Sequence, residues 1–249
     1  QSHQDPTLPE ALLGEMSDTA RVIFPVDANS AAEALHSVYR GRGEIACLVI
    51  PKRQVGELLT QEEAADALRI GAIRIAGDLE SARVQFVAIG AYQAVEALAA
   101  HDRLAGRGVA SCVTLVLEPG RFRSGRDPIE TASTAPDHMV RGLFPAGLPR
   151  ILLTHTRPEP MTGLLRRIDE GPGRLRALGY LSRGGTLDVP GMLFANRCTW
   201  AHAVDAAMTI AGLRQTGLLT EDERRAIEGT GDPSVLKQVL PIHRTETVQ

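Results

Sequence analysis

Residues 84–105 read VQFVAIGAYQAVEALAAHDRLA, and this stretch decides the fold. The largely apolar run 84–89 predicts a buried β-strand, because a strand covered on both faces needs no polar alternation. Gly and Ala at 90–91 predict a turn, and the apolar spacing over 92–105 predicts a helix. A strand, a short turn and a helix make up the first part of a βαβ unit.

The same alternation of apolar runs and amphipathic stretches extends in both directions. Capping boxes at 30–33 and 60–63 predict helix starts, with Ser30 or Asn29 as the first cap. The run 45–50 predicts a strand covered on both faces, whereas 118–136 is rich in Gly, Pro and Ser and predicts a loop. The other predicted strands are 21–24, 71–76, 111–117, 151–154 and 175–181, and the other predicted helices are 161–169, 199–213 and two that begin near 220 and 232. We therefore predict an α/β fold in which helices flank a mostly parallel sheet.

The composition excludes several classes of protein. The chain has 249 residues, 43% of them hydrophobic, and a net charge of −3 rather than the basic excess of a nucleic-acid-binding protein. No apolar run approaches the roughly 18 residues of a membrane span. Cys47, Cys112 and Cys198 are far apart and lack metal-ligand spacing, so we expect buried thiols of a cytoplasmic protein and no metal site built by this chain alone. Because the chain opens on Gln1 rather than Met, we expect a fragment or a processed piece.

Candidate site residues follow two predicted strands, where parallel α/β folds place their binding sites. Lys52 and Arg53 follow the strand 45–50 and are suited to contact a phosphate, although a solvated loop is the alternative. His155 follows the strand 151–154, where it is either an acid/base or phosphate-binding group or a hydrogen-bonded structural residue.

Other polar residues give weaker signals. His3 stands beside Gln4 and, from the sequence alone, belongs to a terminal tail. Arg121, Arg123 and Arg126 either grip an anion or lie in a solvated, mobile loop. No GxGxxG, GxxxxGK[ST], GxSxG or HExxH motif occurs, so we expect neither a self-contained nucleotide-binding domain nor a serine hydrolase.

Six segments resemble, in the same order, the carboxyl-terminal part of phosphoketolases, which belong to the transketolase-like thiamine diphosphate enzymes. The resemblance covers roughly residues 2–215, and its collinearity at similar spacings makes it specific. The segments, each with the family pattern that it resembles, are 2–6 (T/S-H-Q-D-P), 24–29 (P-P-D-A-N), 48–54 (V-A-G-K-Q), 90–100 (A-G-D…E-A-L-A-A), 154–158 (F-H-G-Y-P) and 179–196 (G-Y…G-T…P-F-D-M…N).

The resemblance implies a fold and a reaction. Residues 1–58 would end a pyrimidine-binding domain, and residues 59–249 would form a transketolase-type carboxyl-terminal domain. Enzymes of this family cleave xylulose 5-phosphate or fructose 6-phosphate with inorganic phosphate, giving acetyl phosphate and an aldose phosphate. They use thiamine diphosphate and Mg²⁺, bound between a diphosphate-binding domain and the pyrimidine-binding domain, usually across a dimer interface. The implied partners are a sugar phosphate, inorganic phosphate, and the remaining polypeptide or a partner subunit in a homo-oligomer.

The resemblance also assigns roles to single residues. His3, in the H-Q-D-P segment, would be catalytic, in proton transfer or dehydration. Lys52, in the G-K-Q segment, would contact the substrate phosphate. His155 and Arg53 are secondary candidates at the same site.

Several departures from the family pattern leave alternatives open. Residues 51–54 read PKRQ where the family has G-K-Q, and 155–158 read HTRP where it has H-G-Y-P. The G-D-G…N metal-diphosphate motif and the Glu that activates the thiamine ring are absent, so we expect this chain alone to be incomplete for activity and to bind no cofactor. The alternatives are a two-carbon ketol transferase of the transketolase type with another acceptor, and a non-catalytic regulatory or dimerisation module.

Overall fold

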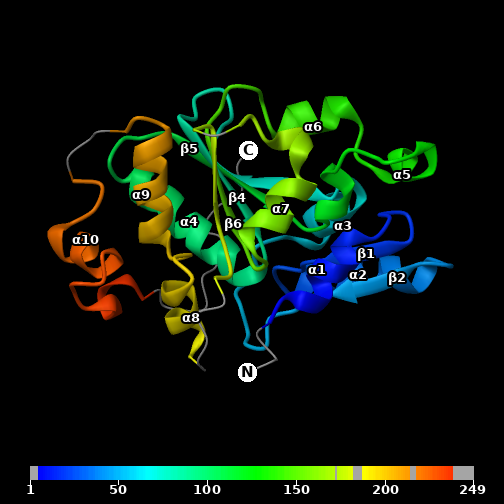
Figure 1. Ribbon diagram of the computed structural model, residues 1–249, viewed down its shortest axis with the longest axis horizontal. Coiled ribbons are helices and arrows are strands. Elements are labelled where there is room, and N and C mark those ends of the chain that lie inside the picture. The colour runs from blue at the N-terminus through cyan, green and yellow to red at the C-terminus, as the bar shows by residue number, and fades with distance from the viewer. Residues whose placement is uncertain (1–4, 172, 182–186, 214–216, 238–249) are drawn as a thin grey trace.

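A five-stranded sheet forms the centre of the computed structural model, which describes residues 5–171, 173–181, 187–213 and 217–237 (Figure 1). Its strands are β3 (Ala72–Ala76), β4 (Val84–Ile89), β5 (Ser111–Val116), β6 (Arg150–Thr154) and β7 (Leu175–Leu178). They lie in the order β3-β5-β4-β6-β7. Only the pairing of β3 with β5 is antiparallel; the pairs β4–β5, β4–β6 and β6–β7 are parallel. The predicted α/β fold with a mostly parallel sheet is confirmed.

Helices cover both faces of this sheet, which explains its continuous apolar strands. Every residue of β4, β5 and β6 is buried. Along β4, Phe86 and Ala88 point into one core while Val87 and Ile89 point into the other, as the two-residue period of a strand requires. The first core is closed by α3 (Gln61–Ile70), α4 (Ala91–Ala105), α9 (Trp200–Ile210) and α10 (Glu221–Ile227). The second is closed by α6 (Asp137–Leu143), α7 (Pro158–Leu164) and the 3₁₀ turns η2 (Pro119–Phe122) and η3 (Arg166–Ile168).

A smaller parallel sheet lies beside the larger one (Figure 1). It consists of β1 (Ala20–Ile23) and β2 (Ile45–Leu48), with α1 (Thr7–Gly14) and α2 (Ala28–Arg40) packed nearby. The predicted strand 45–50, covered on both faces, was wrong in extent and in burial. Ile45 is 56% exposed. The strand ends at Leu48 because its partner β1 ends at Ile23, whose carbonyl accepts the last bond, from the Val49 amide at 2.9 Å.

The start of α2 also corrects the predicted cap. Asp27, not Ser30 or Asn29, is the N-cap, and its carboxylate accepts from the Ser30 amide at 2.8 Å. Ser30 occupies the third helical position and supplies the reciprocal contact, since its hydroxyl accepts from the Asp27 amide. The cap is therefore a carboxylate, where the sequence pattern predicted the side chain of Ser30 or Asn29. At α3, the predicted capping box from Thr60 to Glu63 is confirmed.

The stretch 118–136 is more ordered than the predicted loop. It contains η2 and α5 (Pro128–Ser133), whose N-cap Asp127 accepts from the Glu130 amide. The sequence prediction also missed α1, α6 and α8 (Val189–Ala195), and near residue 232 it placed a helix where the structure has the 3₁₀ turn η4 (Pro233–Leu236). Within the described residues, no helix combines the length and the apolar character needed to cross a bilayer.

Candidate functional site

A cleft of about 460 Å³ opens where the carboxyl ends of β2, β4 and β6 approach the start of α4. It brings together three residues that the sequence singled out: Lys52, Arg53 and His155. The fourth, His3, lies outside the described residues. Segments far apart in the chain thus meet at one edge of the two sheets, where ligands bind in parallel α/β folds.

Lys52 and Arg53 supply positive charge to the cleft. They lie in the loop after β2, four and five residues beyond its last residue, rather than directly after the strand as predicted. Both side chains are exposed, and neither forms an ion pair within the described part of the chain. The Arg53 amide donates to the Tyr92 hydroxyl at 3.3 Å, which ties this loop to the first turn of α4.

His155 follows β6 and lines the cleft. Its amide donates to the Ile89 carbonyl at 3.0 Å, and its ring lies 6.4 Å from that of Phe24. Burial lowers the pKa of His155, a shift that the charge of Glu10 partly opposes. The imidazole is therefore neutral at pH 7, able to donate from one nitrogen and to accept at the other.

The rim of the cleft is formed partly by the beginning of the described chain. Asp5 and Pro9 line the cleft, and Glu10 accepts from the Arg157 amide at 2.7 Å. The Arg157 guanidinium also pairs with Glu10, and with Asp5 at 3.7 Å. Residues 5–10 are thereby held against the loop that follows His155.

Gln93 was not foreseen as a site residue. It was assigned only to the helix 92–105, yet it lines the cleft. Gly90 precedes this helix with φ of +113°, a conformation that L side chains rarely adopt. The signal available in the sequence was a glycine between a buried strand and a long helix, an arrangement that aims helix amides at an anion.

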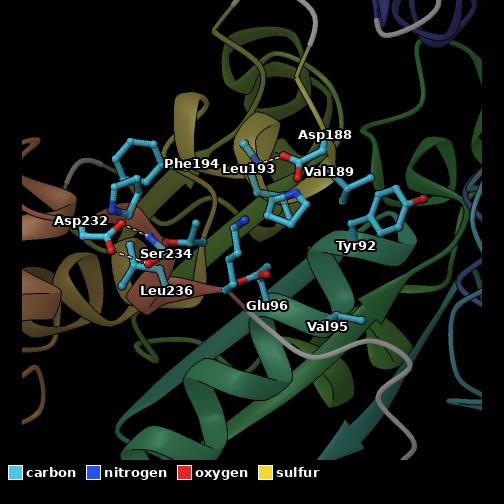
Figure 2. Close-up of a pocket in the computed structure, with 15 residues that line it drawn as sticks. Tyr92, Val95, Glu96, Asp188, Val189, Leu193, Phe194, Asp232, Ser234 and Leu236 are labelled. Carbon is cyan, nitrogen blue, oxygen red and sulfur yellow. Dashed lines mark hydrogen bonds between the residues drawn. The ribbon is translucent and has the colours of Figure 1, made fainter.

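A second cavity of about 340 Å³ lies between α4 and α8 and, like the cleft, is lined by Tyr92 (Figure 2). Glu96 projects from α4 into it and accepts from the Trp200 amide at 2.6 Å. Burial raises the pKa of Glu96 to about 8, and the hydrogen bond from the Trp200 amide offsets only part of this shift. Glu96 therefore caps α9 from a neighbouring helix while holding a proton at neutral pH.

The cluster of three arginines at 121–126 does not line the cleft. Arg123 and Arg126 pair with the buried Glu130, at 3.3 Å and 2.9 Å. Both also donate to the Glu15 carbonyl. Hydrogen bonding from Arg126 is the main reason why the pKa of Glu130 falls to about 2. For Arg123 and Arg126, the alternatives of an anion grip or a mobile loop are thus replaced by contacts that join Glu130 of α5 to the end of α1.

The donor groups of the described residues do not suit a metal–diphosphate group. Within them, no group of three or more His, Cys, Asp or Glu side chains is arranged to hold a metal ion. The cleft's two carboxylates are engaged elsewhere, since Asp5 binds Thr7 and Arg157 and Asp188 accepts from the Gly191 amide. We therefore derive no step through a metal or a diphosphate cofactor from these residues.

Comparisons with known proteins give one family and one fold. The family model of D-xylulose 5-phosphate/D-fructose 6-phosphate phosphoketolase matches residues 1–41. No curated protein sequence matches the chain.

Several solved transketolases share the fold. Transketolase from Leishmania mexicana is 16% identical with a TM-score of 0.62, over 86% of this chain and 28% of that one. A transketolase complex with sedoheptulose 7-phosphate from Pichia stipitis is 16% identical with a TM-score of 0.57, over 78% and 25% of the two chains. An inactive β4 tetramer of a split-gene transketolase is 16% identical with a TM-score of 0.55, over 78% and 59%.

The match thus spans about a quarter of the length of the single-chain transketolases. The chain has a fold that occurs in transketolases, and its first 41 residues match the phosphoketolase family model.

Proposed function

We propose that the chain is the carboxyl-terminal portion of a phosphoketolase-like enzyme. The whole enzyme would cleave a ketose phosphate, xylulose 5-phosphate or fructose 6-phosphate, with inorganic phosphate. The products are acetyl phosphate, an aldose phosphate two carbons shorter, and water. In domain terms, residues 1–58 would end the pyrimidine-binding domain and residues 59–249 would form the carboxyl-terminal domain.

One observation carries this proposal. The segment that matches the phosphoketolase model contributes Asp5 and Pro9 to the same cleft that holds Lys52, Arg53 and His155. The sequence similarity and the predicted site therefore meet at one place in the fold, although they come from separate parts of the chain.

The roles follow from charge and protonation. Lys52 would bind the phosphate of the substrate as an exposed ammonium, and Arg53 would add a second cation beside it. His155, neutral and partly buried, would donate to or accept from a sugar hydroxyl. His3 is proposed as a proton-transfer residue on the resemblance of its segment alone.

The complete enzyme would use thiamine diphosphate and Mg²⁺, which supply the carbanion chemistry that splits the carbon–carbon bond. The described residues of this chain lack a matching set of metal ligands. The remaining polypeptide, or a partner subunit of a homo-oligomer, would therefore hold both. The inactive split-gene tetramer provides a precedent for a transketolase piece of comparable fold.

The fold also occurs in transketolases, so a two-carbon ketol transfer to a sugar acceptor is the second candidate. Turnover by the complete enzyme separates the two. With fructose 6-phosphate, thiamine diphosphate, Mg²⁺ and inorganic phosphate, we expect acetyl phosphate. Consumption of an aldose acceptor without acyl phosphate would instead identify a transferase.

The Lys52→Ala variant tests the site within the complete enzyme. Loss of one charge-assisted contact should raise KM for the sugar phosphate by about 10- to 100-fold. Lys237→Ala is the matched control, since Lys237 lies outside the cleft and should leave KM unchanged. An unchanged KM in Lys52→Ala would favour a non-catalytic regulatory or dimerisation module.

A further inference from the structure

Arg157 lies where three segments that form the cleft meet. It stands two residues after His155, as the N-cap of α7. Its guanidinium pairs with Glu10 on α1 and approaches Asp5, with 3.7 Å between Nη2 and Oδ1. It also lies over the ring of Tyr180, with Cζ 5.7 Å from the ring centre. Asp5, His155 and Tyr180 all line the cleft, so one side chain joins the beginning of the described chain, the loop after β6 and the segment after β7.

The contact between Arg157 and Glu10 is fixed by two hydrogen bonds. The Arg157 amide donates to Glu10 Oε1 at 2.7 Å, and the guanidinium donates to Oε2. The Glu10 side chain is only 11% exposed, so water reaches little of its carboxylate. A charge enclosed to this degree needs a partner of opposite sign, and Arg157 is the cation that the described residues supply. The pair therefore fastens α1 to the loop that follows His155.

Tyr180 is held to the same loop by its backbone as well as by its ring. Its amide donates to the Thr156 carbonyl at 3.0 Å. This close approach requires Gly179, because a Cβ there would collide with that carbonyl. A guanidinium over an aromatic ring is attracted by the negative face of the ring. Arg157 and the backbone bond together hold Tyr180 at the cleft.

The charge of Glu10 also acts on His155. Burial lowers the pKa of His155, and the negative charge of Glu10 opposes that shift. Arg157 balances the charge of Glu10 at close range, so it limits how strongly Glu10 acts on the imidazole. The other charged residues that line the cleft with His155 are Asp5, Lys52, Arg53 and Asp188. Because Asp5 also lies beside Arg157, a change at Arg157 alters the electrostatics of this side of the cleft.

We propose that Arg157 is a positioning residue of the cleft, which holds residues 5–10, His155 and Tyr180 in one arrangement and balances the charge of Glu10. Arg157 is not one of the cleft's lining residues in the described part of the chain, so it acts through these neighbours rather than on a substrate. It stands where the phosphoketolase pattern H-G-Y-P has Tyr, so this arginine is a departure of the chain from that pattern. Its effect on turnover rests on the proposed function, whereas its effect on His155 does not.

Titration of the His155 ring by NMR, in the full 249-residue chain, tests the charge balance without turnover. Arg157→Leu leaves the charge of Glu10 unbalanced, so the pKa of His155 should rise. Glu10→Gln removes that negative charge, so the pKa of His155 should fall. Arg157→Lys keeps the positive charge and should leave the pKa close to that of wild type.

Arg167→Leu is the matched control for this titration. Arg167 pairs with Asp137 at 2.6 Å and lies outside the cleft, so its loss should not move the pKa of His155. An unchanged His155 pKa in both Arg157→Leu and Glu10→Gln would overturn the charge balance.

Kinetics of the complete enzyme test the positioning. Arg157→Leu should lower kcat by about tenfold or more, because small misplacements of reacting groups are costly, and should change KM for the sugar phosphate by less than about threefold. Lys52→Ala should show the reverse split, with the larger change in KM. Arg157→Lys keeps a charge but not the guanidinium fork, so it should recover only part of kcat. Wild-type kcat in Arg157→Leu, or equal losses in Arg157→Leu and Arg167→Leu, would overturn the positioning role.

The two readouts separate a failure of this inference from a failure of the proposed function. If the complete wild-type enzyme forms no acetyl phosphate, the proposed function fails, and the His155 titrations still decide whether Arg157 balances Glu10. If it forms acetyl phosphate while Arg157→Leu keeps the wild-type kcat and His155 pKa, the positioning role fails and the function stands. Urea unfolding checks the fold of each variant. Where Arg157→Leu does not fold, Glu10→Gln and Arg157→Lys decide, and wild-type kcat in both would overturn the positioning role.

Discussion

The two sheets of this chain differ in how completely their strands are covered. In the larger sheet every residue of β4, β5 and β6 is buried, with one core on each face. In the smaller sheet β2 is exposed at Ile45, partly buried over its other three residues, and paired only with β1 within the described chain. The smaller sheet joins these two cores through Ile23 and Val22 of β1, at its border with the larger sheet, and is open at β2. The candidate cleft takes residues from both sides of that border.

The largest expected effect comes from the core of the larger sheet. Phe86 is fully buried on its central strand, so Phe86→Ala should lower the free energy of unfolding by about 3–5 kcal/mol. Ile45→Ala in β2 is the counterpart and should cost about 0.5 kcal/mol or less, since the side chain is 56% exposed. Urea unfolding of the two variants measures both. Equal losses would show that the two sheets do not differ in this way.

The next largest effect concerns the border between the two sheets, where β1 contacts the segment after β5. Arg21 on β1 forms two hydrogen bonds with Glu118, which follows β5, at 2.8 Å and 2.9 Å. This partner raises the pKa of Arg21, so the guanidinium stays charged. Glu118→Ala should cost about 3 kcal/mol, because it leaves the largely buried Arg21 cation with a single, longer ion pair, to Glu44 at 3.5 Å. Hydrogen exchange should then speed up in β1 and β2 and stay slow in β4.

The double variant Arg21→Met, Glu118→Leu serves as the control for that prediction. Replacing both charges by apolar groups removes the buried cation, so much of the lost stability should return. If Glu118→Ala instead loosens β4 as much as β2, the border is part of the larger core and the comparison fails.

A third effect depends on pH and concerns Glu96 on α4, a helix that packs against the larger sheet. Glu96 ionises near 4.5 when unfolded, but burial raises its pKa to about 8 in the folded chain. Between these values the native state binds more protons, so its stability falls as pH rises and levels off above about pH 8. Glu96→Gln keeps an acceptor for Trp200 without this loss. Relative to wild type it should gain about 3 kcal/mol between pH 5 and pH 8.

Thermal or urea unfolding at the two pH values measures this gain. Glu62→Gln, on the exposed side of α3, is the control and should leave the pH dependence as it is in wild type. Parallel pH profiles for Glu96→Gln and wild type would contradict the buried, protonated carboxyl.

The same contrast explains how far the sequence could predict this structure. Buried strands such as β4 are short and largely apolar, and β4 is followed directly by Gly90, so their positions followed from the pattern alone. The apolar run around β2 looked alike, yet its length is limited by the end of β1, a partner that the pattern does not reveal. Likewise no pattern in 118–136 indicated a folded segment, because its order comes from Glu130, which pairs with Arg126 and accepts from the Ser17 amide.

The candidate site was predictable in part, for a related reason. Lys52, Arg53 and His155 follow apolar runs, and the rule that sites lie at the carboxyl ends of strands brought them into view. Gln93 was invisible in the sequence, because its buried and unpaired amide results from its fold back over Gly90. Whether its Oε1 has a partner depends on the neighbours that the fold brings to it, and the sequence does not show these.

The smallest expected effect comes from the loss of one helix cap, and it tests whether that loss stays local to α3. Thr60 caps α3, and its hydroxyl accepts from the Glu63 amide at 3.2 Å on the exposed surface. Thr60→Ala should therefore cost about 1 kcal/mol, whereas Thr60→Ser keeps the hydroxyl and should cost almost nothing. Because α3 packs against both β3 and α2, hydrogen exchange shows which unit responds. Faster exchange confined to the first turn of α3 fits a cap that acts locally. Faster exchange throughout α2 and β2 would mean that the smaller sheet depends on α3 as well as on the border formed by Arg21 and Glu118.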